Sequence, residues 1–501
     1  MIKSNAKKIL SALLCAVFIG ALFISCQSPG GNGGSENNAV TDNPDQSGDT
    51  VTETETAKLV PNLPDDLYYD GYEFTVLATS ESGDLVRNDF HAESLTGEVI
   101  NDAKYMRNSY VEEKYGVKIT NLSVGWKVGE GVTRITKSTA AGDFAYDAAM
   151  VSVYDACNLV LAGLLLDLNS MPYIDLSQPW WDQKANLDLN IRGGMYFTTG
   201  DISQVVNDAT YAVLFNKNLV RDYELENPYE LVKSGKWTYD KISELGKSVH
   251  SDLDGNGIFN EWDLYGAIVE DDTMMSMVNS IGEKCADINS NGVIELTIYN
   301  ERVVSAFEKY TDWVFDKTIV YAYQRSGLGD ENFIRMYENN QALFLLRGMH
   351  TITELRAMET DFGILPFPKL DDKQTDYYSA VGSWHSMFLC VPSVQADAER
   401  TAVILEALAA ESLYTLRPAY YDISLKGKHA RDEESVEMLD IILSSRIYDF
   451  GWYYQFGGYN NEIMNLIRNY NSEFTSMYEK NLSKAETDIQ KVNDKFNELL
   501  G

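Results

Sequence analysis

The pattern of apolar and polar positions predicts an α/β protein. A strand over residues 72–78 is followed by apolar residues at helical spacing over 99–110, and Gly116 then ends that helix. A second strand comes next, then a helix over 131–141, and then a short apolar strand over 148–153 that passes directly into a further helix. Strands that alternate with helices in this way indicate a largely parallel sheet.

Two loops at the ends of these strands are candidate ligand-binding positions. In open α/β sheets, ligands bind beyond the carboxyl ends of the strands. Thr79, Ser80 and Glu81 follow the first strand, and Tyr154 and Asp155 follow the strand that precedes the third helix. We therefore expect these loops to face a ligand.

The second half of the chain is predicted to contain longer helices and two more strands. Val303, Phe307, Tyr310 and Val314 trace one face of a helix. Strands are predicted over 342–346 and 362–365, and from residue 396 onward the pattern is mainly helical. Apolar stripes at helical spacing usually form core, so we assign these faces to packing.

The N-terminal residues match the pattern of an export signal. Three lysines precede an apolar run over 9–24, which is short for a membrane span. Ser25 stands directly before Cys26, as in lipoproteins, whereas Phe23 occupies a place where an ordinary signal peptidase needs a small residue. We expect residues 1–25 to be removed and Cys26 to carry a lipid that anchors an extracytoplasmic protein to the cell membrane. Plain secretion is the alternative.

Residues 26–67 are predicted to form a flexible tether. After Cys26 this stretch has no aromatic residue and one lysine, and it is rich in Gly, Asn, Ser, Thr, Asp and Glu. A flexible chain of roughly 35 residues has an end-to-end distance on the order of 30 Å. That distance is enough to hold a globular body away from a membrane.

The length and charge of the mature chain limit its class. Without the signal, 501 − 25 = 476 residues remain, which is more than one core usually organises, so two lobes are expected. Aromatic residues make up 12% of the chain, which suits an aromatic recognition surface. The net charge of −34, without a basic stripe, argues against nucleic-acid binding.

The cysteines and histidines predict neither a disulfide framework nor a catalytic centre. Cys157, Cys285 and Cys390 are odd in number and far apart, so we expect buried thiols. The histidines also lie far apart and form no transition-metal or nucleophile signature; they are His91, His250, His350, His385 and His429.

Residues 252–263, DLDGNGIFNEWD, follow the spacing of a calcium-binding loop. Gly257 stands at the sixth place, where such a loop turns sharply. The candidate ligands are Asp252, Asp254, Asn256, the carbonyl oxygen of Ile258, Asn260 and Asp263. Aspartate at the twelfth place is shorter than the usual glutamate, and a turn that binds no ion is the alternative. A second stretch over 287–292, DINSNG, is predicted to be a hairpin turn only.

Four stretches, taken in order, resemble a known family. They read YDAAMVSVYDACNLVLAGLLLDL, DATYAVLFNKNLVRDY, GKWTYDKISELGKSV and DFGILPFPKL with the following SAVGSWHSMFLCVP and AERTAVILEALAAES. This order is similar to that of the extracellular solute-binding proteins that serve ABC importers, in the sugar-binding group that includes maltose-binding protein. The resemblance extends from about residue 72 to the C-terminus, and the loop over 252–263 is an addition to the plan of maltose-binding protein.

The resemblance implies a periplasmic-binding-protein type II fold, in which two α/β lobes are joined by crossing hinge strands and the C-terminal part is helical. Lobe 1 is expected to contain residues 68–207 and 366–412, and lobe 2 residues 208–365 and 413–501. The implied function is capture of a sugar or oligosaccharide between the lobes, with closure by hinge rotation and delivery to the permease of an ABC importer. We expect a monomer and no catalysis, and we expect calcium to have only a structural role.

A sugar ring stacks on aromatic side chains, and its hydroxyl groups pair with carboxylates, amides and guanidinium groups. The ligand-binding residues that the resemblance implies are Tyr154, Asp155, Asp208, Tyr211, Asp271, Arg347, Trp384, Trp452 and Tyr453. Asn207, Glu270 and Asp272 lie beside them in sequence, and Trp180 and Trp181 are rim candidates. Met274 and Met275 stand where aromatic residues are expected, and Arg347 has a structural salt bridge as its alternative.

Two other functions remain open at this stage. An anchored glycoside hydrolase would need two carboxyl groups about 5 to 9.5 Å apart, and the sequence selects no such pair. The same clamp with a cationic peptide or polyamine as its ligand is the second alternative, in which Asp155, Asp208 and Asp271 would neutralise the positive charge.

Overall fold

The computed structural model describes residues 58–79, 89–125, 127–421 and 432–501, and residues 59–501 form one compact unit. The expected signal peptide, Cys26 and residues 26–57 of the expected tether lie outside the described residues, as do Ser80 and Glu81. No helix among the described residues combines the length and the apolar character that a membrane span requires.

The first sheet is built from five strands in the order β2-β1-β3-β13-β4. They are β1 (Tyr72–Thr79), β2 (Val117–Val124), β3 (Ala148–Ser152), β4 (Phe197–Thr198) and β13 (Met387–Cys390). The first three strands pair in parallel, as predicted, whereas β13 is antiparallel to both β3 and β4. The sheet is therefore mixed, because a strand from the distant C-terminal half enters it.

The predicted helices between the first strands are confirmed. They are α1 (Val99–Tyr115), α2 (Glu130–Ala141) and α3 (Val153–Ala162). Gly116 ends α1 in the left-handed conformation, with φ of 62°, and a Cβ atom there would also collide with the ring of Tyr68. Glycine is required at this turn for both reasons.

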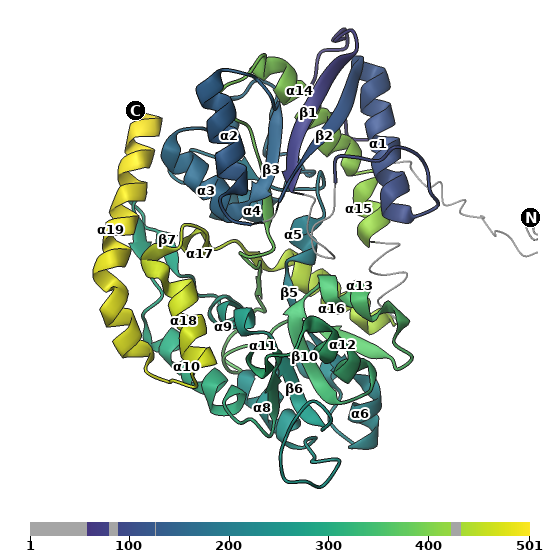
Figure 1. Cartoon of the computed structure of the whole chain (residues 1–501), viewed down its shortest axis with the longest axis vertical. Helices are drawn as coiled ribbons and strands as arrows, with labels where there is room; N and C mark the ends of the chain where they lie inside the picture. The colour runs from purple at the N-terminus through teal and green to yellow at the C-terminus, as the bar shows by residue number, and fades with distance from the viewer. Residues whose placement is uncertain (1–57, 80–88, 126, 422–431) are drawn as a thin grey trace, which may run out of the picture. The chain divides into compact units, whose positions relative to one another are not determined.

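The second sheet has the order β11-β5-β10-β6-β9. Its strands are β5 (Tyr211–Asn216), β6 (Tyr265–Val269), β9 (Val320–Ala322), β10 (Ala342–Gly348) and β11 (Phe362–Leu365). Here β6 pairs in parallel with β9 and β10, and β5 is antiparallel to β10 and β11. Figure 1 shows the two sheets in separate halves, with β1 to β3 in one and β5, β6 and β10 in the other.

The chain passes between the sheets more than once. It leaves the first sheet after β4, continues into β5 of the second, and returns between β11 and β13. Two short strands, β12 (Ser379–Ala380) and β14 (Arg446–Ile447), pair in parallel beside these crossings. Two sheets joined by crossing strands form the expected two lobes, and the residue boundaries of the lobes stay a prediction.

The helical character of the C-terminal part is confirmed. Its helices are α14 (Ala398–Ser412), α15 (Leu416–Pro418), α16 (Glu433–Ser444), α17 (Phe450–Tyr453), α18 (Tyr459–Arg468) and α19 (Phe474–Leu500). The last helix, α19, contacts residues from both halves. The ring centroids of Phe474 and Phe307 lie 4.9 Å apart, and those of Phe496 and Tyr196 lie 5.6 Å apart. A helix expected in lobe 2 thus also contacts lobe 1.

The remaining elements are shorter, apart from α10. The helices are α4 (Gln183–Asp188), α5 (Val205–Asp208), α6 (Lys217–Asp222), α7 (Pro228–Lys233), α8 (Tyr239–Lys247), α9 (Met274–Ser280), α10 (Glu301–Val314), α11 (Tyr323–Ser326), α12 (Asp330–Glu338) and α13 (His350–Glu354). Single 3₁₀ turns are Leu168–Ser170, Asp271–Thr273, Leu355–Ala357 and Phe456–Gly458. The predicted apolar face of α10 is fully buried, which confirms its assignment to core.

Two smaller predictions are also confirmed. The strands β7 (Ala286–Ile288) and β8 (Ile294–Leu296) pair as a hairpin, with Gly292 at φ of 73° in the turn, as expected for residues 287–292. Cys157, Cys285 and Cys390 are buried and free, and burial raises the pKa of each thiol.

Candidate functional site

A group of polar and aromatic side chains converges between the two sheets, and we refer to it as the interlobe cluster. Most members lie near the end of a strand or in a segment that crosses between the sheets, whereas Asn460 lies in α18. Its residues are Tyr154, Asp208, Tyr211, Glu270, Asp272, Arg347, Ser383, Trp384, His385 and Asn460. The carboxyl ends of β3, β6 and β10 supply Tyr154, Glu270 and Arg347, so the rule that ligands lie beyond strand ends points to this region.

Tyr154 lies at the centre of the aromatic side of the cluster. Its hydroxyl group donates to Ser383 Oγ at 2.7 Å and accepts from Asn460 Nδ2 at 3.4 Å. The ring of Trp384 stands edge-on to the ring of Tyr154, with centroids 5.5 Å apart. The side chain of Trp384 is only partly buried, and its Nε1 has no hydrogen-bond partner among the described residues. Two of the aromatic residues that were predicted to bind ligand, Tyr154 and Trp384, therefore lie together beside polar groups.

Glu270 and Asp272 form the acidic side of the cluster. Glu270 accepts a hydrogen bond from the Tyr323 hydroxyl at 2.8 Å and lies 3.7 Å from Arg347 Nε. Asp272 is 7% exposed and has no hydrogen bond or ion pair with a described side chain. Burial, with the nearby Glu270 carboxylate, raises the pKa of Asp272 to about 8. Tyr211 is also fully buried, and its hydroxyl group has no partner among the described residues.

Arg347 is held by an ion-pair network. Its guanidinium group lies 3.3 Å from carboxylate oxygens of both Asp330 and Glu354, in addition to Glu270, and it stacks 4.5 Å above the ring of Phe333. The structural salt bridge that was the alternative prediction for Arg347 is therefore present. A contact of Arg347 with ligand stays a prediction.

The carboxylate of Asp155 caps a helix. It accepts from the backbone N–H groups of Gly129 at 2.5 Å, Gly131 at 2.7 Å and Val132 at 3.3 Å, at the start of α2. Burial raises the pKa of this carboxyl, and the three N–H groups act in the opposite direction. Both oxygens are therefore already occupied in the first lobe.

The other two predicted carboxylates also have partners within the protein. Asp271 is fully buried and lies 3.2 Å from Arg325 Nε and 2.9 Å from Arg468 Nε. Asp208 accepts a hydrogen bond from the Tyr420 hydroxyl at 2.7 Å. Neither carboxylate is an unpaired group in this structure.

Four of the predicted aromatic residues are buried in the core. Trp452 donates from Nε1 to Asn279 Oδ1 at 3.2 Å, and the Tyr453 hydroxyl lies 3.5 Å from the carbonyl oxygen of Val381. The indole groups of Trp180 and Trp181 both donate to the carboxylate of Glu406 in α14, at 3.0 Å each. These side chains hold elements together, and their ligand contacts stay predictions.

Sequence reasoning did not identify Ser383, His385 or Asn460 as members of the cluster. Ser383 and His385 flank Trp384 in the return crossing. This stretch was singled out from the sequence, but only Trp384 within it was predicted to bind ligand. The rings of His385 and His350 lie 5.4 Å apart, although 35 residues separate them. A search of the crossing segment for polar neighbours of the predicted tryptophan would have found two of the three residues.

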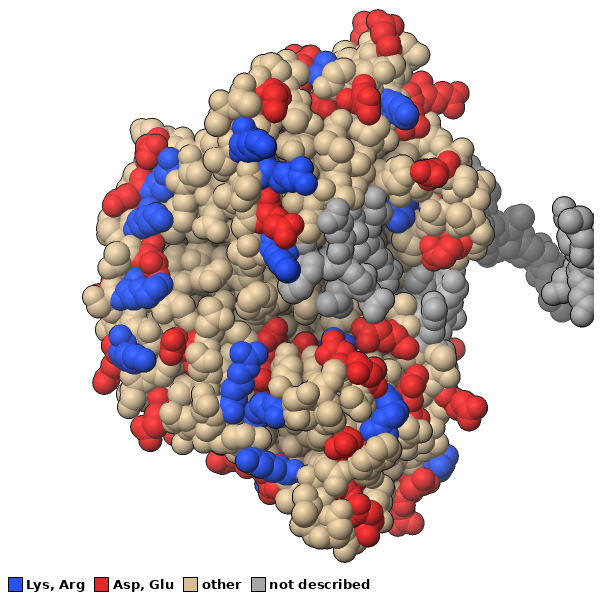
Figure 2. All heavy atoms as spheres, in the orientation of Figure 1, with Lys and Arg blue, Asp and Glu red and all other residues tan. Residues whose placement is uncertain are grey.

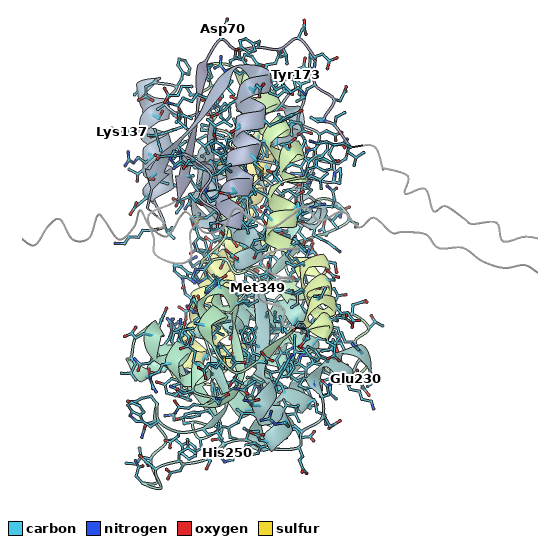
Figure 3. All side chains as sticks on the ribbon, turned by 90° about the vertical axis from the view of Figure 1, so that its right-hand side faces the viewer. Asp70, Lys137, Tyr173, Glu230, His250 and Met349 are labelled. Carbon is cyan, nitrogen blue, oxygen red and sulfur yellow. The ribbon has the colours of Figure 1, made fainter. Side chains whose placement is uncertain are left out.

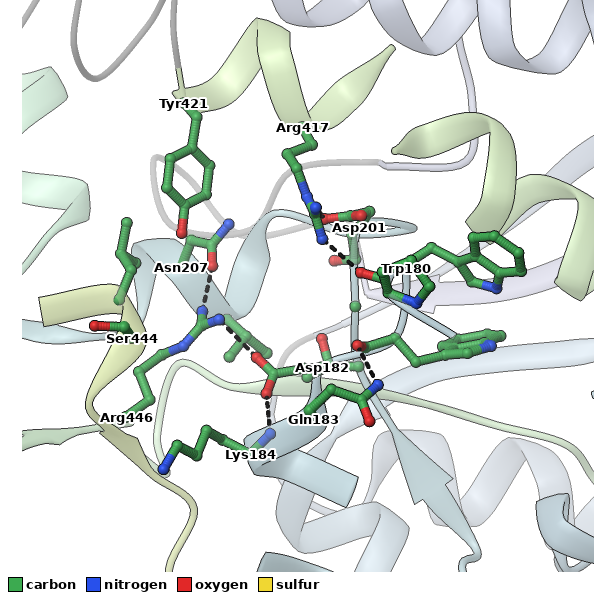
Figure 4. A pocket seen from close by; sticks show the side chains of 17 residues that line it. Trp180, Asp182, Gln183, Lys184, Asp201, Asn207, Arg417, Tyr421, Ser444 and Arg446 are labelled. Atoms are coloured by element: carbon green, nitrogen blue, oxygen red, sulfur yellow. Dashed lines mark hydrogen bonds and ion pairs between the residues drawn. The ribbon is translucent and has the colours of Figure 1, made fainter. Parts of the chain in front are cut away.

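A separate polar pocket of about 390 Å³ lies beside the crossings. Figure 4 shows Arg446 directed at Asp182, to which it is paired at 2.6 Å, and Arg417 paired with Asp201 at 2.7 Å. Burial raises the pKa of Asp201 to about 6, although Arg417 acts in the opposite direction. Asn207 lines this pocket, whereas its neighbour Asp208 belongs to the interlobe cluster.

The loop over 252–263 gathers its carboxylates as a calcium loop would. Asp252, Asp254 and Asp263 each offer an oxygen, and these three atoms lie within 4.8 Å of one another. Asp263 is fully buried and accepts from the backbone N–H groups of Leu253 at 2.9 Å and Asn260 at 2.8 Å, so it closes the loop. The donor set is all oxygen, which suits a hard cation such as Ca²⁺.

The loop lies away from the crossings. Figure 3 shows His250, two residues before the loop, at the far end of the half that holds the second sheet. Met349, which follows β10, lies near the middle, where its backbone N–H donates to the carbonyl oxygen of Thr210 at 2.8 Å. The loop and the interlobe cluster are therefore distinct sites.

Comparison with known proteins identifies the fold. No protein-family model and no curated protein matches the sequence. A cyclo/maltodextrin-binding protein in complex with maltotetraose is similar in structure, with a TM-score of 0.57 and 14% identity, over 84% of this chain and 96% of that chain. A cyclic α-maltosyl-1,6-maltose-binding protein from Arthrobacter globiformis has a TM-score of 0.55 and 14% identity, over 85% and 99% of the two chains.

A third similar structure is an ABC substrate-binding protein from Listeria monocytogenes in complex with cycloalternan. It has a TM-score of 0.53 and 15% identity, over 84% of this chain and 99% of that chain. At these identities the likeness establishes the architecture. The chain therefore has the two-lobed α/β fold of sugar-binding ABC substrate-binding proteins, and the periplasmic-binding-protein type II fold expected from the sequence is confirmed.

Proposed function

We propose that this protein captures a sugar or oligosaccharide between its two lobes and delivers it to an ABC importer. The observation that carries the proposal is the pairing of Tyr154 with the partly buried Trp384, next to Ser383 and Asn460, between two sheets joined by crossing strands. The described similar structures include sugar complexes of maltotetraose and cycloalternan, and this supports a carbohydrate as the ligand class.

The chemistry of the cluster suits a neutral polyhydroxy ligand. The apolar face of a pyranose ring stacks on an indole or phenol ring, and its hydroxyl groups exchange hydrogen bonds with amide, hydroxyl and carboxylate groups. Trp384 offers the ring, while Ser383, Asn460 and Asp272 offer polar groups nearby. Closure of the lobes would remove water and strengthen these contacts.

The same proposal includes how the protein is presented. Cys26 would carry a lipid, and residues 26–67 would tether the monomeric body outside the cell membrane, near the permease. Labelling with a lipid precursor tests the anchor. We expect label in the full chain and none in Cys26→Ser, whereas label in the variant would contradict lipidation at this residue.

We also propose calcium binding by the loop over 252–263. The ion would be held by Asp252, Asp254 and Asp263, with Asn256, the carbonyl oxygen of Ile258 and Asn260 completing the oxygen set. Calcium would stabilise the folded loop by mass action, because the ordered ligand set exists only in the folded state. It would not contact the sugar, since the loop lies away from the crossings.

The structure bears differently on the two alternatives, a cationic ligand and a hydrolase. Asp155, Asp208 and Asp271, which were expected to neutralise a cationic peptide or polyamine, are all hydrogen-bonded or ion-paired within the protein. For a hydrolase, Glu270 and Asp272 are the candidate pair, because they offer oxygens within 4.8 Å of each other, near the about 5 Å of a retaining pair. We propose binding without turnover.

Calorimetry on the mature protein tests the binding proposal. Maltose, maltotetraose and a cyclic α-glucan are titrated beside spermidine and a lysine peptide, and each mixture is then analysed for products after long incubation. We expect saturable binding of at least one sugar and no hydrolysis. Binding of only the amines, or hydrolysis that Asp272→Asn abolishes, would overturn the proposal.

A pair of tryptophan variants locates the site. Trp384→Ala should weaken sugar binding at least tenfold, because truncating a central aromatic contact typically costs about 2 kcal/mol or more, and a tenfold change corresponds to about 1.4 kcal/mol. Trp262→Ala is the matched control, since that side chain is 59% exposed on the calcium loop and should leave affinity unchanged. Equal affinities in both variants, with unchanged melting temperatures, would place the ligand elsewhere.

A further inference from the structure

Three metal-ligating side chains meet in the interlobe cluster. Glu270 and Asp272 follow β6 in the second lobe, and His385 lies in the return crossing between β12 and β13. Each offers one ligand atom, and these three atoms lie within 4.8 Å of one another. The group brings together residues that are more than 100 positions apart in the sequence, so the fold alone assembles it.

All three side chains keep atoms without a hydrogen-bond partner among the described residues. Asp272 is 7% exposed and has no side-chain hydrogen bond or ion pair there. Glu270 is 4% exposed, and its Oε2 accepts no hydrogen bond, while His385 Nε2 is buried without one. A buried polar atom that lacks a partner costs roughly 1–3 kcal/mol. These two buried atoms, with the Asp272 carboxylate beside the same group of side chains, indicate a ligand that would satisfy them together.

Carboxylates outnumber guanidinium groups around the three residues, which favours binding of a cation. Arg325 and Arg468 are both paired with Asp271, and Arg347 is shared between Glu270, Asp330 and Glu354. Among the described residues, five carboxylates therefore face three guanidinium groups here, and Asp272 is the one that none of these guanidinium groups contacts within 4.0 Å. A divalent cation bound beside Asp272 would hold this carboxyl group in its deprotonated form.

The donor types favour a transition-metal ion over calcium. Calcium prefers six to eight oxygen ligands, whereas two carboxylates and one imidazole suit ions such as Zn²⁺, Mn²⁺ or Co²⁺. Ligand distances of about 2.0–2.2 Å would require only a small closing movement of the three side chains. Three protein ligands also leave at least one coordination position open, and that position would face the space between the lobes.

We propose that Glu270, Asp272 and His385 bind one divalent transition-metal ion between the lobes. The ion would hold the return crossing against the second lobe, since His385 and the two carboxylates belong to different segments. Its open position would accept a water molecule or an oxygen atom of a ligand. This site is independent of the calcium loop, which offers oxygen donors only.

Cobalt titration of the mature protein, after dialysis against EDTA, tests the proposal with the metal alone. Wild-type protein should bind one equivalent of Co²⁺ with visible absorption bands that report nitrogen ligation, and one equivalent of Zn²⁺ should displace it. Asp272→Asn and His385→Gln should each weaken Co²⁺ binding at least tenfold. Asp287→Asn, in the β7–β8 hairpin, is the matched control and should bind Co²⁺ like wild type.

The outcome is decisive even if one variant folds poorly. Melting curves in EDTA identify a variant that folds poorly, and Co²⁺ binding by the other variant is then compared with that by wild type. No saturable Co²⁺ or Zn²⁺ binding by wild type, or binding that both variants retain, would overturn the site. Since no sugar is added, failure here leaves the sugar proposal standing, and failure of sugar binding leaves this site standing.

Discussion

The loop over 252–263 and the interlobe cluster both gather carboxylates, but they do so by opposite means. In the loop the acidic residues are close in sequence, and they accept hydrogen bonds from backbone N–H groups of other residues in the same loop. In the cluster the acidic residues are buried, and among the described residues Arg347 pairs with Glu270 and Tyr420 with Asp208, while Asp272 has no such side-chain partner. The comparison teaches that spacing in sequence reveals a local site, whereas a site assembled by the fold has no such signature.

Arg347 should be the most sensitive point of the cluster. Arg347→Ala removes the cation that Glu270, Asp330 and Glu354 share, and leaves a buried carboxylate uncompensated. Breaking a buried pair in this way costs roughly 3–5 kcal/mol of unfolding free energy, which urea denaturation at pH 7 would measure. Arg221→Ala is the control, because its pair with Asp222 is exposed and should contribute at most about 1 kcal/mol. Similar losses in both variants would contradict the distinction between buried and exposed charges.

Glu406 extends the comparison to a carboxylate held by indole groups instead of cations. Burial raises the pKa of Glu406 from 4.5 to about 7, and the indole N–H groups of Trp180 and Trp181 act in the opposite direction. Between pH 4.5 and 7 the unfolded chain releases this proton while the folded protein keeps it. The Glu406 carboxyl should therefore lower the free energy of unfolding as pH rises through that window, by on the order of 3 kcal/mol in total.

Glu406→Gln isolates this contribution because glutamine does not titrate. The variant should gain stability relative to wild type as pH rises from 5 to 8, as measured by urea denaturation at each pH. Glu399→Gln, on an exposed position of the same helix, should show no such trend. A constant difference between Glu406→Gln and wild type across this range would contradict the raised pKa.

The calcium loop should respond to metal rather than to pH. At a calcium concentration one hundred times Kd, binding should add about 2.7 kcal/mol to the unfolding free energy and raise the melting temperature. Asp254→Ala should abolish the rise, whereas Asp287→Ala, in the β7–β8 hairpin, should retain it. A calcium-dependent shift that survives Asp254→Ala would show that the loop is not the site.

Substitution of Asp155 should give the smallest loss of stability. It distinguishes a helix-capping role of this carboxylate from a contact with the sugar. Asp155→Ala leaves the first N–H groups of α2 without their acceptor, which should cost about 1–2 kcal/mol. Sugar affinity should remain within a factor of two of wild type. A stable variant with tenfold weaker sugar binding would instead show that Asp155 contacts the ligand.

The sequence predicted the elements well because their signals are local. Gly116 at the end of α1 and the buried stripe of α10 were readable from spacing alone. The antiparallel entry of β13 into the first sheet was not, since that pairing joins segments more than 200 residues apart. Figure 2 shows acidic and basic side chains interspersed on the displayed face.

The candidate site was only partly readable for the same reason. Tyr154 and Trp384 were predicted and lie in contact. Trp452 was predicted from the resemblance and Trp180 as a rim candidate, and neither signal distinguishes a binding tryptophan from a buried one. Their indole groups bond to Asn279 and Glu406. His385 was dismissed because histidine spacing carries no metal signature, yet the fold brings it to two carboxylates.

The structure of a sugar complex tests the central claim most directly. Crystals grown with a ligand identified by calorimetry should show a pyranose ring against Trp384, between the two sheets, with its hydroxyl groups within hydrogen-bond distance of the interlobe cluster. A ring bound outside that cluster, for example in the pocket of Arg417 and Arg446, would contradict the account.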